Sequence, residues 1–246
     1  MNERQASARI FCAIDTAEMA AATELVARLG GVIGGVKLGL EFFTANGPQG
    51  VREIAAKAGR RCLFLDLKFH DIPDTVSAAV RAATALGPCM LNVHASGGAA
   101  MLRASAEGAA EEAARLGIAR PLVVGVTVLT SLDEDDLEAV GQPSRVADRV
   151  GRLAELCQES GLDGVVCSGH EIAALRARCG PDFRLVVPGI RPARPGPRDH
   201  KRVMDPGQAI SAGADYLVIG RPITKAPDPA EAARRIVAEM ADAIVQ

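Results

Sequence analysis

The chain has 246 residues, of which 48% are hydrophobic and 24% are charged, and its net charge is −2. This composition is that of a globular protein with a sizeable core, and the near-neutral charge provides no bulk attraction to nucleic acid or to an anionic membrane. One Tyr and no Trp also argue against an aromatic platform for single-stranded nucleic acid.

Strand and helix patterns alternate along the whole chain. In chain order, the predicted strands are residues 10–15, 35–39, 62–67, 90–95, 122–128, 164–168, 184–190 and 216–220. The predicted helices are residues 16–29, about 49–58, 75–86, 97–116, 134–140, 144–159, 170–178 and 229–245. Thr16 is the expected N-cap of the first helix, and Gly30 closes that helix.

The predicted strands are short, continuous apolar runs, which are typical of a parallel sheet covered by helices. About eight alternations over this length predict an α/β fold of the (β/α)8 or TIM-barrel type. No Ser/Gly-rich or Pro-rich linker interrupts the pattern, so we expect a single domain over residues 1–246. A doubly wound open sheet is the alternative, because periodicity alone does not separate the two.

The six cysteines show neither Cys-x-x-Cys pairs nor the spacing of a zinc site. We expect them to be reduced, which fits a cytoplasmic protein. The polar residues 1–9 lack the apolar core of a signal peptide, and no apolar run reaches the roughly 20 residues that span a bilayer. The sequence therefore predicts no membrane partner and no metal site.

An acid, a base and a second acid follow one another near the end of the third predicted strand. Asp66 and Lys68 lie on the same strand face, because side chains alternate, and Asp71 follows on a loop that Pro73 keeps out of the strand. We expect the two carboxylates to bracket the Lys68 ammonium. The carboxyl ends of parallel strands carry the chemistry of such folds, so these residues are catalytic candidates. A structural salt bridge is the alternative.

Further charges lie at the ends of other predicted strands. Asp15 follows the first strand and Lys37 lies within the second, and a barrel would bring both to the same mouth, although either alone could be a surface charge. Arg191 and Arg221 follow the seventh and eighth strands, where barrels commonly bind phosphate. The basic segment 191–202 contains three prolines after Arg191 and is either a lid over that phosphate or a solvated loop.

Five segments, in order, are similar to one known family. They are residues 66–75 (DLKFHDIPDT), 92–98, 126–131, 188–192 and 219–222. The first closely resembles the signature of orotidine 5′-monophosphate decarboxylases, and the matches span nearly the whole chain. The resemblance implies a homodimeric barrel that converts orotidine monophosphate to UMP, the last step of de novo pyrimidine synthesis, without a cofactor.

The resemblance also implies roles for individual residues. Asp15 and Lys37 would hold ribose hydroxyls. Asp66 would face the substrate carboxylate, and Lys68 would be the proton donor. Asp71 would reach into the neighbouring site of the dimer.

Further positions are implied to bind substrate: Thr75 from across the dimer, Thr130 at the pyrimidine, Arg191, Gly220 and Arg221 at the phosphate, and His200, which stands where the phosphate loop commonly has Gln.

Two other functions stay open. One is a metal-dependent sugar-phosphate decarboxylase or aldolase, which shares an Asp-x-Lys-x-x-Asp core. The other is a non-catalytic barrel that senses pyrimidine nucleotides.

Overall fold

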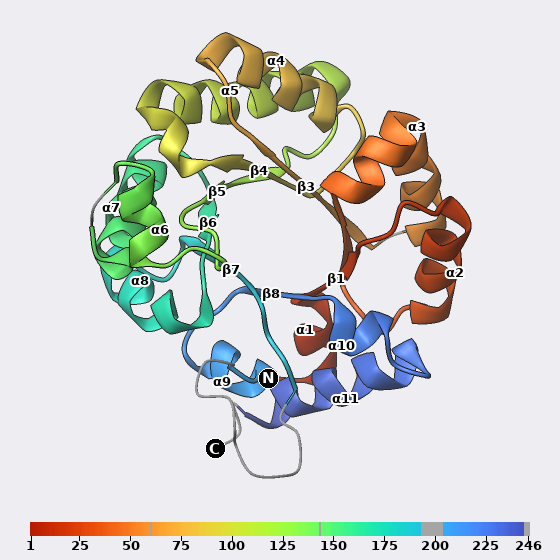
Figure 1. Cartoon of the computed structure of the whole chain (residues 1–246). Helices are drawn as coiled ribbons and strands as arrows, with labels where there is room; N and C mark the ends of the chain where they lie inside the picture. Colours follow the sequence, from red (N-terminus) through yellow and green to blue (C-terminus); the bar gives the residue numbers. More distant parts are fainter. Residues whose placement is uncertain (60, 143, 193–203, 244–246) are drawn as a thin grey trace.

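The chain folds into a closed barrel of parallel strands surrounded by helices. The computed structural model describes residues 1–246 except 60, 143, 193–203 and 244–246. Within the described residues, eight strands pair in chain order, and β8 returns to pair with β1. The view along the barrel axis shows the helices as an outer ring (Figure 1). The TIM-barrel prediction is confirmed, and the open sheet is wrong because no strand of this sheet is left at an edge.

The elements have the following bounds. The strands are β1 Ile10–Ile14, β2 Gly35–Gly39, β3 Cys62–Phe69, β4 Met90–His94, β5 Leu122–Val126, β6 Gly164–Val166, β7 Arg184–Pro188 and β8 Tyr216–Ile219. The helices are α1 Glu3–Ala8, α2 Met19–Leu29, α3 Leu40–Ala58, α4 Pro73–Thr84, α5 Gly98–Leu116, α6 Glu134–Ala139, α7 Val146–Glu159, α8 Ile172–Cys179, α9 Pro206–Ser211, α10 Arg221–Thr224 and α11 Pro229–Asp242, with short 3-10 turns at Ala95–Gly97 and Gly169–Glu171.

Helix α2 begins later than the sequence predicts. Its N-cap is Glu18, and Thr16 lies outside the helix, where its hydroxyl accepts a hydrogen bond of 3.2 Å from the Glu18 amide. The prediction of Thr16 as the cap is therefore wrong, because its side chain closes the turn after β1 instead.

Helix α3 begins nine residues before its predicted start at about residue 49, since its first residue is Leu40. Gly47, with a φ of 58°, interrupts the helical backbone, and Pro48 opens the second half. Both residues are strong helix breakers, so the sequence predicts only the second half of α3.

Side chains on each strand alternate between the barrel interior and the layer against the helices. On β1, Phe11 and Ala13 belong to one apolar cluster, whereas Ile10, Cys12 and Ile14 belong to the other. The first cluster fills the interior with Phe11, Ala13, Phe64, Met90, Val124, Val186 and Val218. The polar residues at the carboxyl end of the barrel pack directly above this apolar layer.

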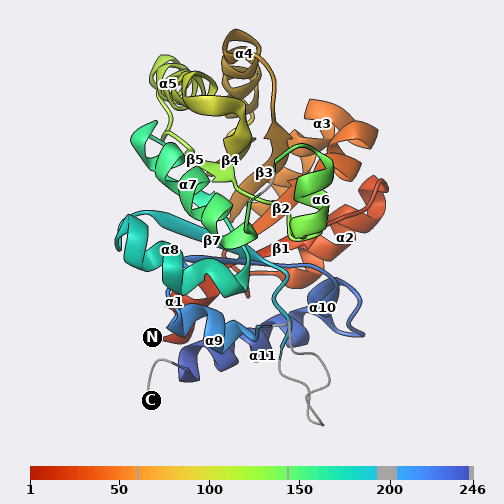
Figure 2. The same ribbon diagram turned by 60° about the vertical axis from the view of Figure 1, so that its left-hand side comes forward.

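The view turned by 60° shows α1, α9 and α11 together below the strands, near the N-terminus (Figure 2). Helices α1 and α9 both pack against α11. Neither α1 nor α9 is among the predicted helices; each has six residues, which give little periodic pattern. In the described part of the chain, no helix is long and apolar enough to cross a membrane.

Candidate active site

The alternation that fills the barrel interior also brings polar side chains together at its carboxyl end. Lys37 is paired in register with Ala13, an interior residue, and Asp15 lies two residues after Ala13. Asp66 and Lys68 follow the interior residue Phe64 at steps of two. Side chains two residues apart share a strand face, so these groups project into the same mouth.

The charged groups form one connected network around Asp66. The Lys37 ammonium lies 3.0 Å from Asp66 Oδ2 and 3.4 Å from Asp15 Oδ1. The Lys68 ammonium lies 2.5 Å from Asp66 Oδ1. Lys37 and Asp66 are buried, whereas Asp15 is exposed at the rim. The structure thus brings together four of the five charged residues that the sequence placed at the mouth.

Asp66 is held as a carboxylate despite its burial. Burial by itself would raise its pKa, but the two ammonium groups and the hydrogen bonds from Lys68 and Asn92 outweigh that effect and hold the pKa below its usual range. The network therefore presents a fixed negative charge between two positive ones.

Asn92 is a member of this site that sequence reasoning did not select. Its side-chain amide donates to Asp66 Oδ1 at 2.6 Å, and its Oδ1 accepts from the Lys68 amide at 2.8 Å. It is 1% exposed. The available signal was a polar residue inside the apolar run of β4, a position where a buried amide needs partners.

The backbone of Lys68 departs from strand geometry. Its φ is 51°, the only positive value outside glycine among the described residues, and the β3–β4 register shifts between Leu65 and Phe69. A positive φ is costly for a side chain as long as lysine. The hydrogen bond from the Lys68 amide to Asn92 holds this conformation, which aims the ammonium at Asp66.

Asp71 does not bracket the Lys68 ammonium within the single chain. Its Oδ1 instead accepts a hydrogen bond from the amide of Ile72 at 2.6 Å, and its side chain is exposed. The expected bracket is thus wrong for one chain, because the turn before α4 leads the chain away from the network. Thr75, in the first turn of α4, is also exposed.

Two histidines lie side by side next to this network. The rings of His70 and His94 have centroids 5.4 Å apart. Burial, followed by the proximity of His70 and Lys68, lowers the pKa of His94. A neutral His94 adds no further positive charge next to Lys68.

The remaining predicted positions that the structure describes follow strands at the same end of the barrel. Gly220 borders Asp15, since a Cβ on Gly220 would lie 3.9 Å from Asp15 Oδ2. Arg221 starts α10, Arg191 follows β7, and Thr130 follows β5; all three side chains are exposed. His200 and most of the segment 191–202 lie outside the described residues.

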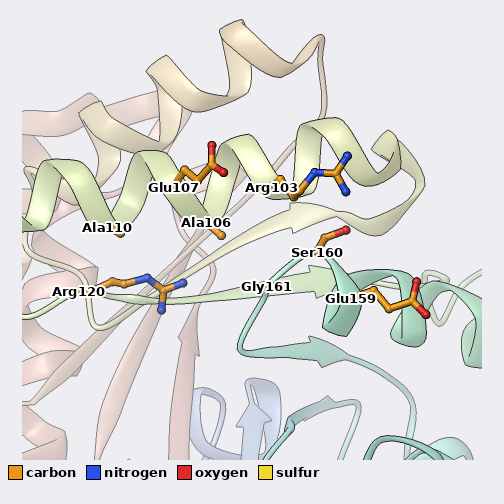
Figure 3. Close-up of a pocket in the computed structure, with 8 residues that line it drawn as sticks. All are labelled: Arg103, Ala106, Glu107, Ala110, Arg120, Glu159, Ser160 and Gly161. Atoms are coloured by element: carbon orange, nitrogen blue, oxygen red, sulfur yellow. The ribbon is translucent and has the colours of Figure 1, made fainter.

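A separate hollow of about 430 Å³ lies on the outer surface and shares no residue with the network. Its lining comes from α5, from the chain before β5 and from the end of α7: Arg103, Ala106, Glu107, Ala110, Arg120, Glu159, Ser160 and Gly161 (Figure 3). Arg120 is already paired with Asp163 at 2.8 Å. Among the described residues, no three His, Cys, Asp or Glu side chains are arranged to hold a metal ion.

Comparisons with known proteins agree on one family. The model of the orotidine 5′-phosphate decarboxylase / HUMPS family matches residues 8–236. Proteins named orotidine 5′-phosphate decarboxylase from Paramagnetospirillum magneticum and Rhodospirillum rubrum are each 56% identical over 231 residues, which is 94% of this chain and 97% and 93% of theirs. The crystal structure of orotidine 5′-phosphate decarboxylase from Lactobacillus acidophilus matches with a TM-score of 0.84 at 33% identity, covering 94% of this chain and 98% of that one. The chain belongs to the orotidine 5′-phosphate decarboxylase / HUMPS family.

Proposed function

We propose that this chain is a carboxy-lyase that converts orotidine 5′-phosphate to UMP without a cofactor. The observation that carries the proposal is the buried Asp66 carboxylate held between the ammonium groups of Lys37 and Lys68, at 3.0 and 2.5 Å. It lies at the carboxyl end of a barrel whose relatives at 56% identity bear the decarboxylase name. Such a fixed charge array is suited to a reaction in which negative charge moves from a carboxylate to a carbon atom.

The proposed chemistry centres on Lys68. Loss of CO₂ from C6 of the pyrimidine leaves an electron pair on that carbon, and no cofactor delocalises it. The Lys68 ammonium stabilises the developing carbanion and then protonates C6 to give UMP, after which solvent returns a proton to the amine. Asp66 lies next to the departing carboxylate and orients the Lys68 ammonium. Its negative charge also disfavours the bound substrate while that substrate still carries its own carboxylate.

The rest of the mouth holds the nucleotide. Asp15 and Lys37 take the ribose hydroxyls, and Thr130 takes the pyrimidine. Arg191, Gly220, Arg221 and His200 take the phosphate. A guanidinium offers forked donors that suit a phosphate, and binding energy from this remote group holds the reacting carbon against Lys68.

We also propose that two chains form a homodimer in which Asp71 and Thr75 complete the neighbouring site. Both side chains are exposed in the single chain, and neither contacts its own network. Ile72, between them, is 66% exposed, which is unusual for a large apolar side chain and suits an interface.

Mixing two inactive variants tests this arrangement. A heterodimer of Lys68→Ala and Asp71→Ala chains contains one site with both residues intact. Random reassociation would therefore restore about a quarter of the wild-type activity. Activity that stays at the level of the separate variants after subunit exchange would refute the shared site.

The absorbance change of orotidine 5′-phosphate, followed with and without EDTA, tests the activity itself. We expect turnover that resists the chelator and is abolished in Lys68→Ala. Lys57→Ala, which removes an exposed lysine on α3, is the matched control and should behave like wild type. Substantial turnover in Lys68→Ala would exclude the proposed proton donor.

The same assay separates the two rival functions. Complete loss of activity in EDTA, with turnover of sugar phosphates in magnesium, would indicate the metal-dependent decarboxylase or aldolase. Tight UMP binding without turnover would indicate a nucleotide sensor. We propose that the protein works in the cytoplasm, where its six free thiols stay reduced.

A further inference from the structure

Two cysteines lie next to each other at the amino end of the barrel, opposite the charged network. Cys62 is the first residue of β3, and Cys89 immediately precedes β4. Cys62 is exposed, and Cys89 is half-buried against the interior apolar cluster. The Cys62 side chain is therefore accessible to small reagents, and that of Cys89 is partly accessible.

The backbone fixes the spacing of these cysteines. Phe64 is paired with Met90, so the same register places Cys89 opposite Leu63, one residue from Cys62. The Cys89 amide donates to the Leu63 carbonyl at 2.9 Å, which anchors this arrangement. Neighbouring strands are about 4.8 Å apart with a rise of about 3.3 Å per residue, so the two Cα atoms are about 6 Å apart. Disulfides span Cα distances of about 4.4–6.8 Å.

The two side chains influence each other's titration. The neighbouring Cys89 side chain lowers the pKa of Cys62 to about 7, against the opposing effect of partial burial. The titratable group facing both thiols from β8 is Tyr216, with Arg184 and Asp215 next to it. The lowered pKa of Cys62 favours its thiolate, which is the nucleophilic form of a cysteine.

The other four cysteines differ from Cys62 both in exposure and in the direction of their pKa shift. All four are buried. Burial raises the pKa of Cys12 and of Cys157 to about 12, and it also raises the pKa of Cys167 and of Cys179. Buried neutral thiols behave as small apolar side chains. The chain therefore contains one reactive thiol, Cys62, with Cys89 beside it as the partner that can form a disulfide, and four buried cysteines that serve as internal controls.

We propose that Cys62 and Cys89 form a redox-modification site that closes to a disulfide when the protein meets a peroxide. The Cys62 thiolate attacks one peroxide oxygen, an S–O bond forms, the O–O bond breaks, and the leaving hydroxide takes a proton to become water. The Cys89 sulfur then attacks Cys62, an S–S bond forms, and the S–O bond breaks with loss of a second water. The two thiols together lose two electrons and two protons, and one peroxide is reduced to two waters.

The experiment treats the reduced, full-length protein with a small excess of hydrogen peroxide. The unfolded protein is then alkylated with iodoacetamide and analysed by mass spectrometry. We expect four alkylated cysteines of the six, a peptide map that joins Cys62 to Cys89, and full recovery of six after dithiothreitol. Separately, the rate of Cys62 alkylation in the folded, untreated protein should rise with pH around a midpoint of about 7.

Single variants make the assignment specific. Cys62→Ser and Cys89→Ser should each abolish the cross-link, whereas Cys179→Ser, at a buried thiol, should form it as the wild type does. In Cys89→Ser, Cys62 should stop at the sulfenic acid, which dimedone traps. Six alkylated cysteines after oxidation of the wild type, or a cross-link that survives in Cys62→Ser, would overturn the proposal.

Discussion

Asn92 offers the most direct test of how the site is held together. Asn92→Ala removes a 2.6 Å hydrogen bond to the Asp66 carboxylate and a 2.8 Å hydrogen bond from the Lys68 amide. A hydrogen bond to a charged group contributes about 1.5–3 kcal/mol and a neutral one about 0.5–1.5 kcal/mol, so the free energy of unfolding should fall by about 2–4 kcal/mol.

The kinetic effect should be larger on turnover than on binding. Among the described contacts of the Lys68 amide, only the bond to Asn92 holds its φ of 51°. Without Asn92 the backbone relaxes, and the Lys68 ammonium moves away from its position beside Asp66. A displacement of about 1 Å at the reacting group costs about 100-fold in rate. We therefore expect kcat to fall by about 10- to 100-fold, with a much smaller change in KM.

Urea unfolding and the orotidine 5′-phosphate assay measure the two effects separately. Gln158→Ala is the control, since its side-chain amide donates to the Cys179 carbonyl at 2.9 Å on the outer helices. That variant should lose stability without losing kcat. If Asn92→Ala keeps wild-type kcat while its stability falls, Asn92 has only a structural role, and its assignment as the residue that positions Lys68 is refuted.

Three further predictions concern other parts of the chain. Arg221→Ala should raise KM by about 10- to 100-fold with little change in kcat, because it would remove the charge-assisted hydrogen bonds that we propose it makes to the remote phosphate; steady-state kinetics decide this. Burial lowers the pKa of His94, so the unfolded chain takes up the proton first as pH drops below 6.5. The free energy of unfolding should fall in that window, and His94→Gln should reduce the slope in urea melts across the pH range. Gly164→Ala would place a Cβ 2.1 Å from the Arg184 carbonyl oxygen and should cost about 1–3 kcal/mol, whereas Gly31→Ala, with open space around it, should melt like wild type.

The sequence predicts the eight strands well because each is a continuous apolar run that ends at a breaker or a charge. It fails where the local signal points the other way. Gly47 and Pro48 conceal the first half of α3, although packing keeps Leu40–Ala58 together across the kink. Short helices such as α9 depend on a capping box and tertiary contacts, which leave little periodicity to detect.

The residues of the candidate site likewise fall into those that the sequence predicts and those that it does not. Asp15, Lys37, Asp66 and Lys68 are charges in or beside apolar strands, so they stand out in the sequence. Asn92 carries no charge, and its importance arises from two hydrogen bonds across strands that no local pattern reveals. The position of Asp71 also could not be derived, because it depends on a turn and, as we propose, on a second chain.

The left-handed backbone at Lys68 sets stability against activity at a single residue. Glycine adopts a positive φ at no steric cost, whereas a bulky side chain there costs about 1–3 kcal/mol. Lys68→Gly would therefore relieve the backbone, but it would also remove the ammonium 2.5 Å from the buried Asp66 carboxylate and with it the proposed proton donor. Engineering of this enzyme for industrial temperatures should exempt position 68 from consensus or entropy-based redesign, and should seek its gains in the outer helices.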